Sequence, residues 1–440
     1  MTHLPGNVIE QTLHEYVPVD ELRAQALRLK VVRRLRKVDA YALLLVVILF
    51  VSTREGLSIA GLRRAFALHA GVLLSRSSFA ARWTKSLDAL FDWLLGRIVR
   101  KSRQDVRPVA EAVGGFRDII AVDSTVAKVA DGLRSVWKGT RENSAAAALK
   151  VHTFIRALTG ELLRYKLTAE AYGDSRGFGA GHWIRNCLLL LDQGYSSPSL
   201  WNRVDGHGGF FITRLPADRD PVIVSENRRH RGRAKKLEGM GLREALDGCK
   251  RKMVDVNCRF RAQVRRYRGG KNKNRTVLFR VVGTLDTKTG EYHVYVTNVP
   301  VERLTGEQVG AMYALRWEVE LFYKAAKSGS GLAELPTADP IVVRILVKAA
   351  VIRTALAMTA KRRLEDAIPE SIRINPLSWM KIWNEIGSAL LQDLLAATWH
   401  PEDEKTDWSR LLDDPNPGRR VLRQIVCQGD GVALQRWFFP

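Results

Sequence analysis

The sequence predicts an α/β protein with a helical N-terminal region and a β-rich insertion. Residues 1–105 carry helical patterning, whereas from residue 114 onward the apolar residues fall in short continuous runs. Runs of this kind are typical of strands that are covered on both faces, as in a sheet flanked by helices. After residue 300 the helical pattern returns. We therefore expect a sheet that lies between helical segments.

Length and charge limit the class of protein. The chain has 440 residues, which is enough for about three domains. Hydrophobic residues make up 46% and charged residues 26%, which excludes a wholly disordered or fibrous chain. Lys and Arg number 70 against 46 Asp and Glu, a net charge of +24. Nucleic acid is the expected partner of so basic a protein, ahead of an anionic membrane surface.

Cysteines and apolar runs favour a soluble, cytoplasmic protein. Four scattered cysteines form no CxxC pair, which argues against both a disulfide framework and structural zinc. The longest apolar run, residues 40–51, is shorter than the about 20 residues that span a membrane. It begins far from the N-terminus and lacks a cleavage site, so a buried helix is predicted rather than a secretory signal.

Two features of the helical N-terminal region suggest contact with DNA. Residues 21–37 carry seven basic side chains among leucines and valines, which predicts an amphipathic helix whose basic face is either solvated or binds phosphates. Ser58 and Ser75 are candidate N-caps of two short helices separated by Gly71. Such a pair is compatible with a helix-turn-helix-like unit, although any small helical bundle gives the same pattern.

A set of strands is predicted from residue 119 onward. Their ranges are 119–122, 151–154, 161–167, 188–191 and 210–215. The turn at Thr159 and Gly160 predicts a hairpin between the second and third of these strands. Residues 181–191 are equally compatible with a helix running into a strand.

The positive charge is concentrated in residues 228–275, which hold 18 Lys and Arg against 4 Asp and Glu, a net +14. Strands are predicted at 256–264, 276–285 and 291–297, joined by turns at Gly269-Gly270 and Lys288–Gly290. Because like charges repel, a solvated face explains this segment poorly. We expect a basic β-rich insertion that contacts DNA.

Three acids are candidate functional residues. Asp123 and Asp192 each end a predicted buried strand, and sites assemble at strand ends in open α/β sheets. Either residue alone is more simply explained as the start of a turn. The third acid, Glu320, lies in a helix that begins at a capping box, Thr305 with Gln308, and runs to about residue 328.

A second helix is predicted from residue 339 to 364. In the first, Tyr313, Arg316, Glu320 and Lys327 fall at offsets 0, 3, 7 and 14 and share one face. Three converging carboxylates can hold two divalent cations about 4 Å apart, which activate water or a 3′-hydroxyl and stabilise the leaving oxygen. Oxygen ligands suit Mg²⁺ or Mn²⁺.

The spacing Tyr-x2-Arg-x3-Glu-x6-Lys resembles the signature of a large branch of bacterial insertion-sequence transposases. These are DDE enzymes with a ribonuclease-H-like core. Asp123-Ser-Thr resembles the first acidic block of the family, and Leu191-Asp-Gln-Gly-Tyr resembles the second. Lys150 and His152, followed by the turn at Gly160, resemble the hairpin between the two acids. The resemblance spans about residues 115–350.

The resemblance implies that the carboxylates of Asp123, Asp192 and Glu320 form a catalytic, metal-binding triad with two Mg²⁺ or Mn²⁺ ions. It also implies phosphate contacts at the transposon end by a second set of residues, Tyr313, Arg316 and Lys327. A homodimer that binds terminal inverted repeats and target DNA, with catalysis in trans, is expected. Gln193 stands where the family usually has Arg, and Asp205 is an alternative second acid.

The expected architecture is therefore a ribonuclease-H-like core interrupted by a β-rich insertion. The domains are predicted at 1–110 (helical, DNA-binding), 111–218 (core, first part), 219–300 (insertion), 301–370 (core, second part) and 371–440 (helical). The expected activity is metal-dependent cleavage of transposon ends followed by strand transfer. A nuclease of the same fold and a catalytically idle DNA-binding regulator are the alternatives.

Overall fold

The computed structural model describes residues 5–32, 38–51, 57–70, 74–104, 114–140, 146–227, 236–247, 249, 251–264, 273–330, 332, 334–335, 337–369 and 374–396. Several predicted features fall outside these ranges. They are the end of the basic segment at 33–37, the glycine between the two short helices (Gly71), the basic turn at Gly269-Gly270 and the last residues of the chain, 397–440.

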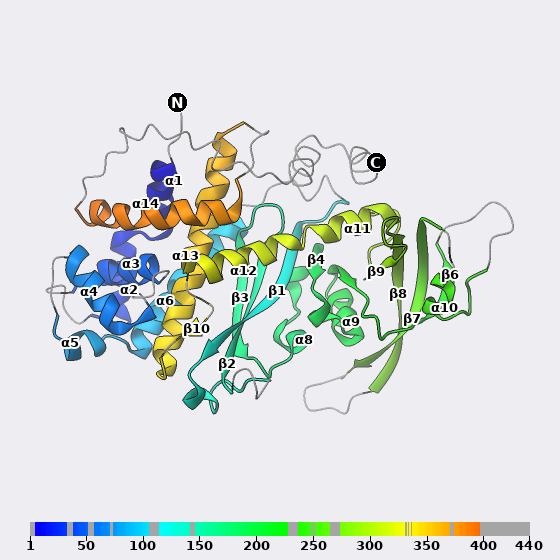
Figure 1. Ribbon diagram of the computed structural model, residues 1–440, viewed down its shortest axis with the longest axis horizontal. Helices are drawn as coiled ribbons and strands as arrows, with labels where there is room; N and C mark the ends of the chain where they lie inside the picture. The colour runs from blue at the N-terminus through cyan, green and yellow to red at the C-terminus, as the bar shows by residue number, and fades with distance from the viewer. Residues whose placement is uncertain are drawn as a thin grey trace.

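One mixed sheet of ten strands runs through the structure (Figure 1). In spatial order its strands are β3 (Leu162–Ala169), β2 (Ala148–Arg156), β1 (Asp118–Val129), β4 (Cys187–Leu191), β5 (Phe210–Arg214), β9 (Tyr292–Thr297), β8 (Lys273–Leu285), β7 (Met253–Val264) and β6 (Val222–Glu226), and β10 (Glu334–Leu335) pairs with β1. Strands β1, β4 and β5 are parallel, whereas β2 and β3 are antiparallel to their neighbours. The predicted α/β class and the β2–β3 hairpin are confirmed.

The central strand β4 shows why a continuous apolar run predicts burial on both faces. Leu188 and Leu190 point into one hydrophobic core, whereas Leu189 and Leu191 point into another. Since side chains alternate along a strand, such a strand needs apolar residues at every position.

The prediction that the first strand ends at Asp123 is wrong. β1 continues to Val129, and it pairs with β2 as far as Lys128 opposite Ala148. The run of consecutive apolar residues stops at Asp123 because polar Asp123, Ser124 and Thr125 interrupt it, while backbone pairing with β2 continues. Asp123 therefore lies within a strand, paired with Thr153 of β2.

The basic insertion extends the same sheet. β9 pairs antiparallel with β5, and β8, β7 and β6 follow in an antiparallel meander. The three strands predicted in this segment are confirmed. An aromatic cluster joins the insertion to the core: the Trp201 ring stacks on Phe211 at 5.6 Å and meets the edges of Phe260 and Phe279.

A group of helices covers the end of the sheet away from the insertion (Figure 1). They are α1 (Pro5–Tyr16), α2 (Val19–Arg28), α3 (Ala40–Phe50), α4 (Ile59–Ala70), α5 (Arg76–Ala80), α6 (Lys85–Gln104), α13 (Pro340–Ala367) and α14 (Pro376–Ala396). The other helices lie along the sheet and the insertion: α8 (Asp174–Gly177), α9 (Pro198–Gly206), α10 (Leu242–Leu246), α11 (Gly306–Ala314) and α12 (Trp317–Ser330). The N-terminal helices α1, α3 and α6 pack against α13, and α1 and α3 also pack against α14, so the two ends of the chain share one hydrophobic core.

Most of the helical predictions are confirmed. The apolar run forms the buried helix α3, and the hydroxyls of Ser58 and Ser75 accept backbone hydrogen bonds at the starts of α4 and α5. The basic helix is shorter than predicted: α2 ends at Arg28, and Lys30 has a left-handed φ of 59°, which α-helical backbone does not allow.

The signature segment forms two helices instead of one. α11 begins at the predicted capping box of Thr305 and Gln308, and α12 follows after Leu315 and Arg316. Between them the backbone makes tighter bonds, such as the Val319 amide to the Arg316 carbonyl at 3.1 Å. The two helices nevertheless lie nearly end to end across the sheet, from the insertion to the helical region (Figure 1).

No helix in the described ranges combines the length and apolarity that crossing a lipid bilayer would require.

Candidate active site

Two carboxylates lie side by side at the neighbouring central strands β1 and β4. β1 and β4 are parallel and Val122 pairs with Leu191, so Asp123 and Asp192, which follow these two residues, are neighbours. The Asp192 side chain accepts a hydrogen bond from the Gly194 amide at 3.3 Å and begins a tight turn. The parallel register thus brings together two acids that are 69 positions apart in the sequence.

The third carboxylate, Glu320, approaches Asp123 and Asp192 from α12. The helix is fixed against β1 by Tyr323, which is buried and whose hydroxyl lies 2.9 Å from the Asp123 carbonyl oxygen. The same hydroxyl accepts a hydrogen bond from Thr153 on β2 at 2.8 Å. This anchor sets the position of Glu320, one helical turn earlier, relative to the two strands.

Arg316 lies between two of the acids. Its guanidinium is 2.5 Å from a Glu320 carboxylate oxygen and 3.5 Å from one of Asp192. It also lies 5.6 Å from the centre of the Tyr313 ring. The predicted shared helix face is therefore present for these three signature residues, despite the break between α11 and α12.

The surroundings of Asp123 change the pKa of its carboxyl group. Burial raises the pKa of its carboxyl to about 7, and the charges of Asp192 and Glu320 act in the same direction. The Ser124 amide, which donates to Asp123 at 2.6 Å, and the Arg316 guanidinium oppose the rise. Three acids this close are stable as carboxylates only with positive charge between them.

The donor set suits a hard divalent cation, since all of its side-chain ligands are oxygen atoms. Among the described residues, however, no three Asp, Glu, His or Cys side chains are arranged around a common metal position. Arg316 supplies the positive charge in this arrangement. Metal binding would thus require its guanidinium to give up its contacts with Asp192 and Glu320.

A fourth acid, Asp174 at the start of α8, lies next to the site. Its Oδ1 atom accepts hydrogen bonds from the Ser124 hydroxyl at 2.7 Å and the Lys150 ammonium at 3.0 Å. A Cβ atom at Gly194 would lie 2.9 Å from Asp174 Oδ2 and 3.8 Å from Asp192 Oδ2. Glycine at this position therefore allows the two carboxyl groups to approach each other.

Sequence reasoning missed Asp174, because no apolar run precedes it. Its one local mark is the turn-forming run of Gly173, Asp174 and Ser175.

His152 is a buried polar residue close to the acids. It is fully buried on β2, with Nδ1 2.9 Å from the Tyr195 hydroxyl and Nε2 2.9 Å from the Thr168 hydroxyl. Burial lowers the pKa of the imidazole to about 4. His152 is therefore neutral at physiological pH and packs as a hydrogen-bonded core histidine.

The remaining signature residues differ in their surroundings. Tyr313 is buried against Tyr295, with 5.2 Å between ring centres, and burial raises its pKa to about 12. Lys327 is exposed two helical turns beyond Glu320, and it takes part in none of the described ion pairs of the acidic cluster. The structure thus groups Tyr313, Arg316 and Glu320 and leaves Lys327 open to solvent.

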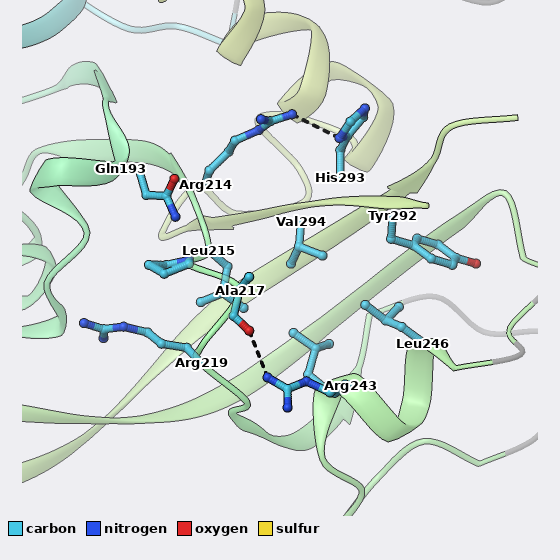
Figure 2. A pocket seen from close by; sticks show the side chains of 12 residues that line it. Gln193, Arg214, Leu215, Ala217, Arg219, Arg243, Leu246, Tyr292, His293 and Val294 are labelled. Carbon is cyan, nitrogen blue, oxygen red and sulfur yellow. Dashed lines mark hydrogen bonds between the residues drawn. The ribbon is translucent and has the colours of Figure 1, made fainter. Parts of the chain in front are cut away.

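Asp205, the alternative second acid, lies elsewhere. α9 carries it back toward the start of β5, where its carboxylate accepts a hydrogen bond from Asn298 at 2.9 Å. Gln193 is exposed beside Asp192 and lines a neighbouring cavity (Figure 2). The geometry therefore favours Asp192 over Asp205 as the partner of Asp123.

The family model described as "Transposase DDE domain" matches residues 114–352, more than half of the chain. The chain belongs to this transposase family. It is an enzyme that acts on DNA, and the matched range runs from the start of the sheet into α13.

Similar proteins include transposases of insertion sequences from Bacillus thuringiensis. The transposase for IS231E from subsp. finitimus is 24% identical over 352 residues, which cover 72% of each chain. The transposase for IS231B from subsp. berliner is 22% identical and covers 70% of each chain. Among solved structures, the piggyBac transposase synaptic complex with hairpin DNA aligns with a TM-score of 0.45 at 11% identity, covering 93% of this chain and 86% of that one.

Proposed function

We propose that the chain catalyses cut-and-paste DNA transposition with Asp123, Asp192 and Glu320 as its catalytic residues. The observation that carries the proposal is the meeting of these carboxylates, from two parallel strands and one crossing helix, around Arg316. The match to the transposase family supports the same reaction class. The membership of the Tyr-Arg-Glu-Lys branch is part of this proposal, resting on the spacing of the four signature residues.

The reaction consists of two phosphoryl transfers. Water attacks a phosphodiester at the element end, the P–O3′ bond breaks, and a free 3′-hydroxyl is left opposite a 5′-phosphate. That hydroxyl then attacks a second phosphodiester, forming a new P–O bond while the displaced oxygen leaves with a proton. The carboxylates of Asp123, Asp192 and Glu320 would hold two Mg²⁺ or Mn²⁺ ions, which lower the pKa of the attacking group and stabilise the leaving oxygen.

The side chains around the acids bind and position the DNA. When the scissile phosphate enters, Arg316 exchanges its carboxylate contacts for charge-assisted contacts to phosphate oxygens. Lys327 is exposed on the same helix and extends this contact along the strand. Tyr313 packs under Arg316 and limits the directions in which the guanidinium can turn.

The proposed partners are DNA and a second copy of the chain. Terminal inverted repeats require two bound ends, so a homodimer is expected in the synaptic complex. The basic insertion and the N-terminal helices are the proposed DNA-contacting regions, within the domain limits predicted from the sequence. A cytoplasmic enzyme that associates with the nucleoid is the matching location.

The decisive experiment uses a labelled duplex that carries the element end, with Mg²⁺ or Mn²⁺. We expect cleaved and joined products from the parent and none from Glu320→Gln, because the amide lacks the charge that binds a cation. DNA binding should remain within about threefold of the parent, since most of the affinity comes from phosphate contacts elsewhere.

Asp205→Asn is the matched control, because it removes one carboxylate outside the acidic cluster. Cleavage without joining would indicate a nuclease. Binding without cleavage by the parent would indicate an idle regulator. Cleavage that survives in Glu320→Gln would remove Glu320 from the triad.

A further inference from the structure

A cavity of about 340 Å³ opens beside the acidic cluster (Figure 2). Its walls come from the end of β5 and the loop after it, from α10 and from the start of β9. Gln193, the residue that follows Asp192, lines the cavity on the side of the acids. The cavity is thus separated from the candidate triad by one residue of the chain.

Strand register explains this position. Leu191 on β4 pairs with Thr213 on the parallel strand β5, so Asp192 and Arg214 emerge at the same edge of the sheet. The neighbouring strand β9 runs antiparallel to β5 and brings His293 to the same edge, where the Arg214 guanidinium donates to its Nδ1 atom at 3.0 Å. Asp192, which follows β4, therefore lies next to the positive charge of Arg214 at the end of β5.

Three arginines surround the cavity, and no Asp or Glu lines it. Arg219 donates to the Ser196 carbonyl at 3.1 Å, and Arg243 donates to the Ala217 carbonyl at 2.8 Å. Both bonds go to neutral oxygens, so they orient the guanidinium groups without neutralising them. Within the described part of the chain no ion pair is found for either side chain or for Arg214.

Two acids next to the lining segments, Asp220 and Asp286, have other partners. Asp220 accepts a hydrogen bond from the Arg243 amide at 2.7 Å, at the first turn of α10. Asp286 lies 3.7 Å from the Nε2 atom of His293, on the far side of the ring from Arg214. In Figure 2, Arg214 and His293 lie at one end of the view and Arg219 and Arg243 at the other, with Val294 between them.

The size of the cavity and the residues that line it indicate which ligand it can bind. The cavity lies at the lower end of the roughly 300–1,000 Å³ range of small-molecule sites, so it has room for a group the size of one nucleotide but not for a duplex. Its apolar wall includes Leu215 and Leu246, and Tyr292 adds an aromatic face. A positive groove with apolar and aromatic surface is how proteins bind single strands without sequence preference.

We propose that this cavity binds the phosphate backbone of single-stranded DNA that leaves the acidic cluster, with Arg219 and Arg243 as its principal phosphate ligands. The proposal rests on the proposed function, because it assumes that a DNA strand lies across Asp123 and Asp192. In this proposal the DNA strand runs from Asp123 and Asp192 past Gln193 into the insertion. Arg214 lies between the acids and the other two arginines and contacts the strand along the way.

The test measures binding of a fluorescent ten-nucleotide oligo-dT in EDTA, where no cleavage occurs. The double variant Arg219→Gln, Arg243→Gln should bind the oligonucleotide about tenfold or more weakly than the parent. Its salt dependence should also flatten by a slope of about 1.4, since each lost single-strand phosphate contact contributes about 0.7. The matched control is Arg259→Gln, Arg261→Gln, which removes the same charge from exposed positions of β7.

The control should lose less than about threefold in affinity. Equal losses in the two double variants would mean that the cavity acts only through general charge, and the proposal would be wrong. Unchanged affinity in the cavity variant would overturn it as well. Tight binding of dTMP alone, comparable to that of the oligonucleotide, would identify a free nucleotide as the ligand instead.

A second measurement needs no variant. In the unsubstituted protein, oligo-dT should slow amide hydrogen exchange in residues 215–219 and 242–246, and not in β7 near Arg259. Absence of this protection would contradict the proposal even if a variant misfolds. Both readouts are independent of cleavage, so a parent that binds at the cavity but never cleaves DNA would refute the transposase proposal alone.

Discussion

At the residue scale, Arg316 lies at the junction between α11 and α12 and contacts two acids of the candidate active site. Its guanidinium contacts Glu320 and Asp192, and its position over the Tyr313 ring restricts how it can move. The same side chain competes with any cation for the two carboxylates. Its removal should therefore have opposite effects on metal binding and on DNA cleavage.

We expect Arg316→Gln to bind Mn²⁺ at least about twofold more tightly than the parent in the absence of DNA, because a positive charge next to the carboxylates is lost. Cleavage of the element end should fall strongly, since the scissile phosphate loses its guanidinium contact. Electron paramagnetic resonance titration measures the Mn²⁺ affinity. Lys324→Gln, on the exposed face of the same helix, serves as the control, and weaker Mn²⁺ binding in Arg316→Gln would contradict this role.

His152 makes stability depend on pH. Its folded pKa of about 4 lies below the unfolded value of about 6.5. Below pH 6.5 the unfolded chain binds a proton that the folded chain does not, so acidification destabilises the fold. Between pH 7 and pH 5 this contribution is on the order of 2 kcal/mol.

His152→Gln should therefore lose less stability over this pH range than the parent, because it removes the titrating group. Urea unfolding at pH 7, 6 and 5 gives the free energies of unfolding to compare. The opposing titration of Asp123 is present in both proteins and cancels in the comparison. Parallel pH dependences in the two proteins would show that His152 does not contribute.

At the element scale, Arg280 holds the insertion to the signature helix. On β8 it binds Asp255 of β7 with two hydrogen bonds of 2.9 and 2.6 Å. It also donates to the carbonyls of Val299 and Leu304, just before α11 begins. All of these contacts are buried, so one side chain links two strands of the insertion with the start of the helix that leads to Glu320.

Arg280→Met should lower the free energy of unfolding by about 3–5 kcal/mol, because it leaves the Asp255 carboxylate buried without its partner. Chemical denaturation measures this change. Arg275→Met, at an exposed position of the same strand, should change stability by less than about 0.5 kcal/mol. A loss of similar size in both variants would show that the strand, and not the ion pair, is sensitive to substitution.

At the scale of the whole molecule, the distribution of positive charge fits the expected course of a DNA strand past the acids. The long sheet extends from the helical region into the insertion, and α11 and α12 lie across it (Figure 1). Residues 228–275, within the insertion, carry a net +14 of the chain's +24, and Arg219 and Arg243 of the insertion line the cavity. A DNA strand that crosses the acids would therefore meet positive charge on the insertion side.

Binding of duplex DNA should accordingly weaken steeply with salt. If six to ten phosphates are contacted, the affinity should fall by about a thousandfold or more between 50 and 200 mM salt, because bound counterions are released. Fluorescence anisotropy over this range gives the slope. A flat response would be inconsistent with a phosphate-dominated interface.

Several local features could be predicted from the sequence because they depend on neighbouring residues. The buried strand β4, the capping box at Thr305 and Gln308, and the turn at Gly160 are set by apolar continuity, side-chain caps and a left-handed backbone, respectively. The limits of β1 and of the signature helix were predicted less well. Strand pairing beyond Asp123 and the tighter turn at Arg316 depend on contacts with distant segments.

The α/β class, the three candidate acids, the spacing of the signature and the excess of positive charge could be predicted from the sequence, since these are properties of composition and of residues close together along the chain. The three-dimensional packing was needed to show that Asp192 and not Asp205 lies beside Asp123, that Asp174 lies next to them, and that three arginines surround one cavity. These relations depend on strand register and on which segments pack together. Register is fixed by pairing across the whole sheet, which no local stretch of sequence contains.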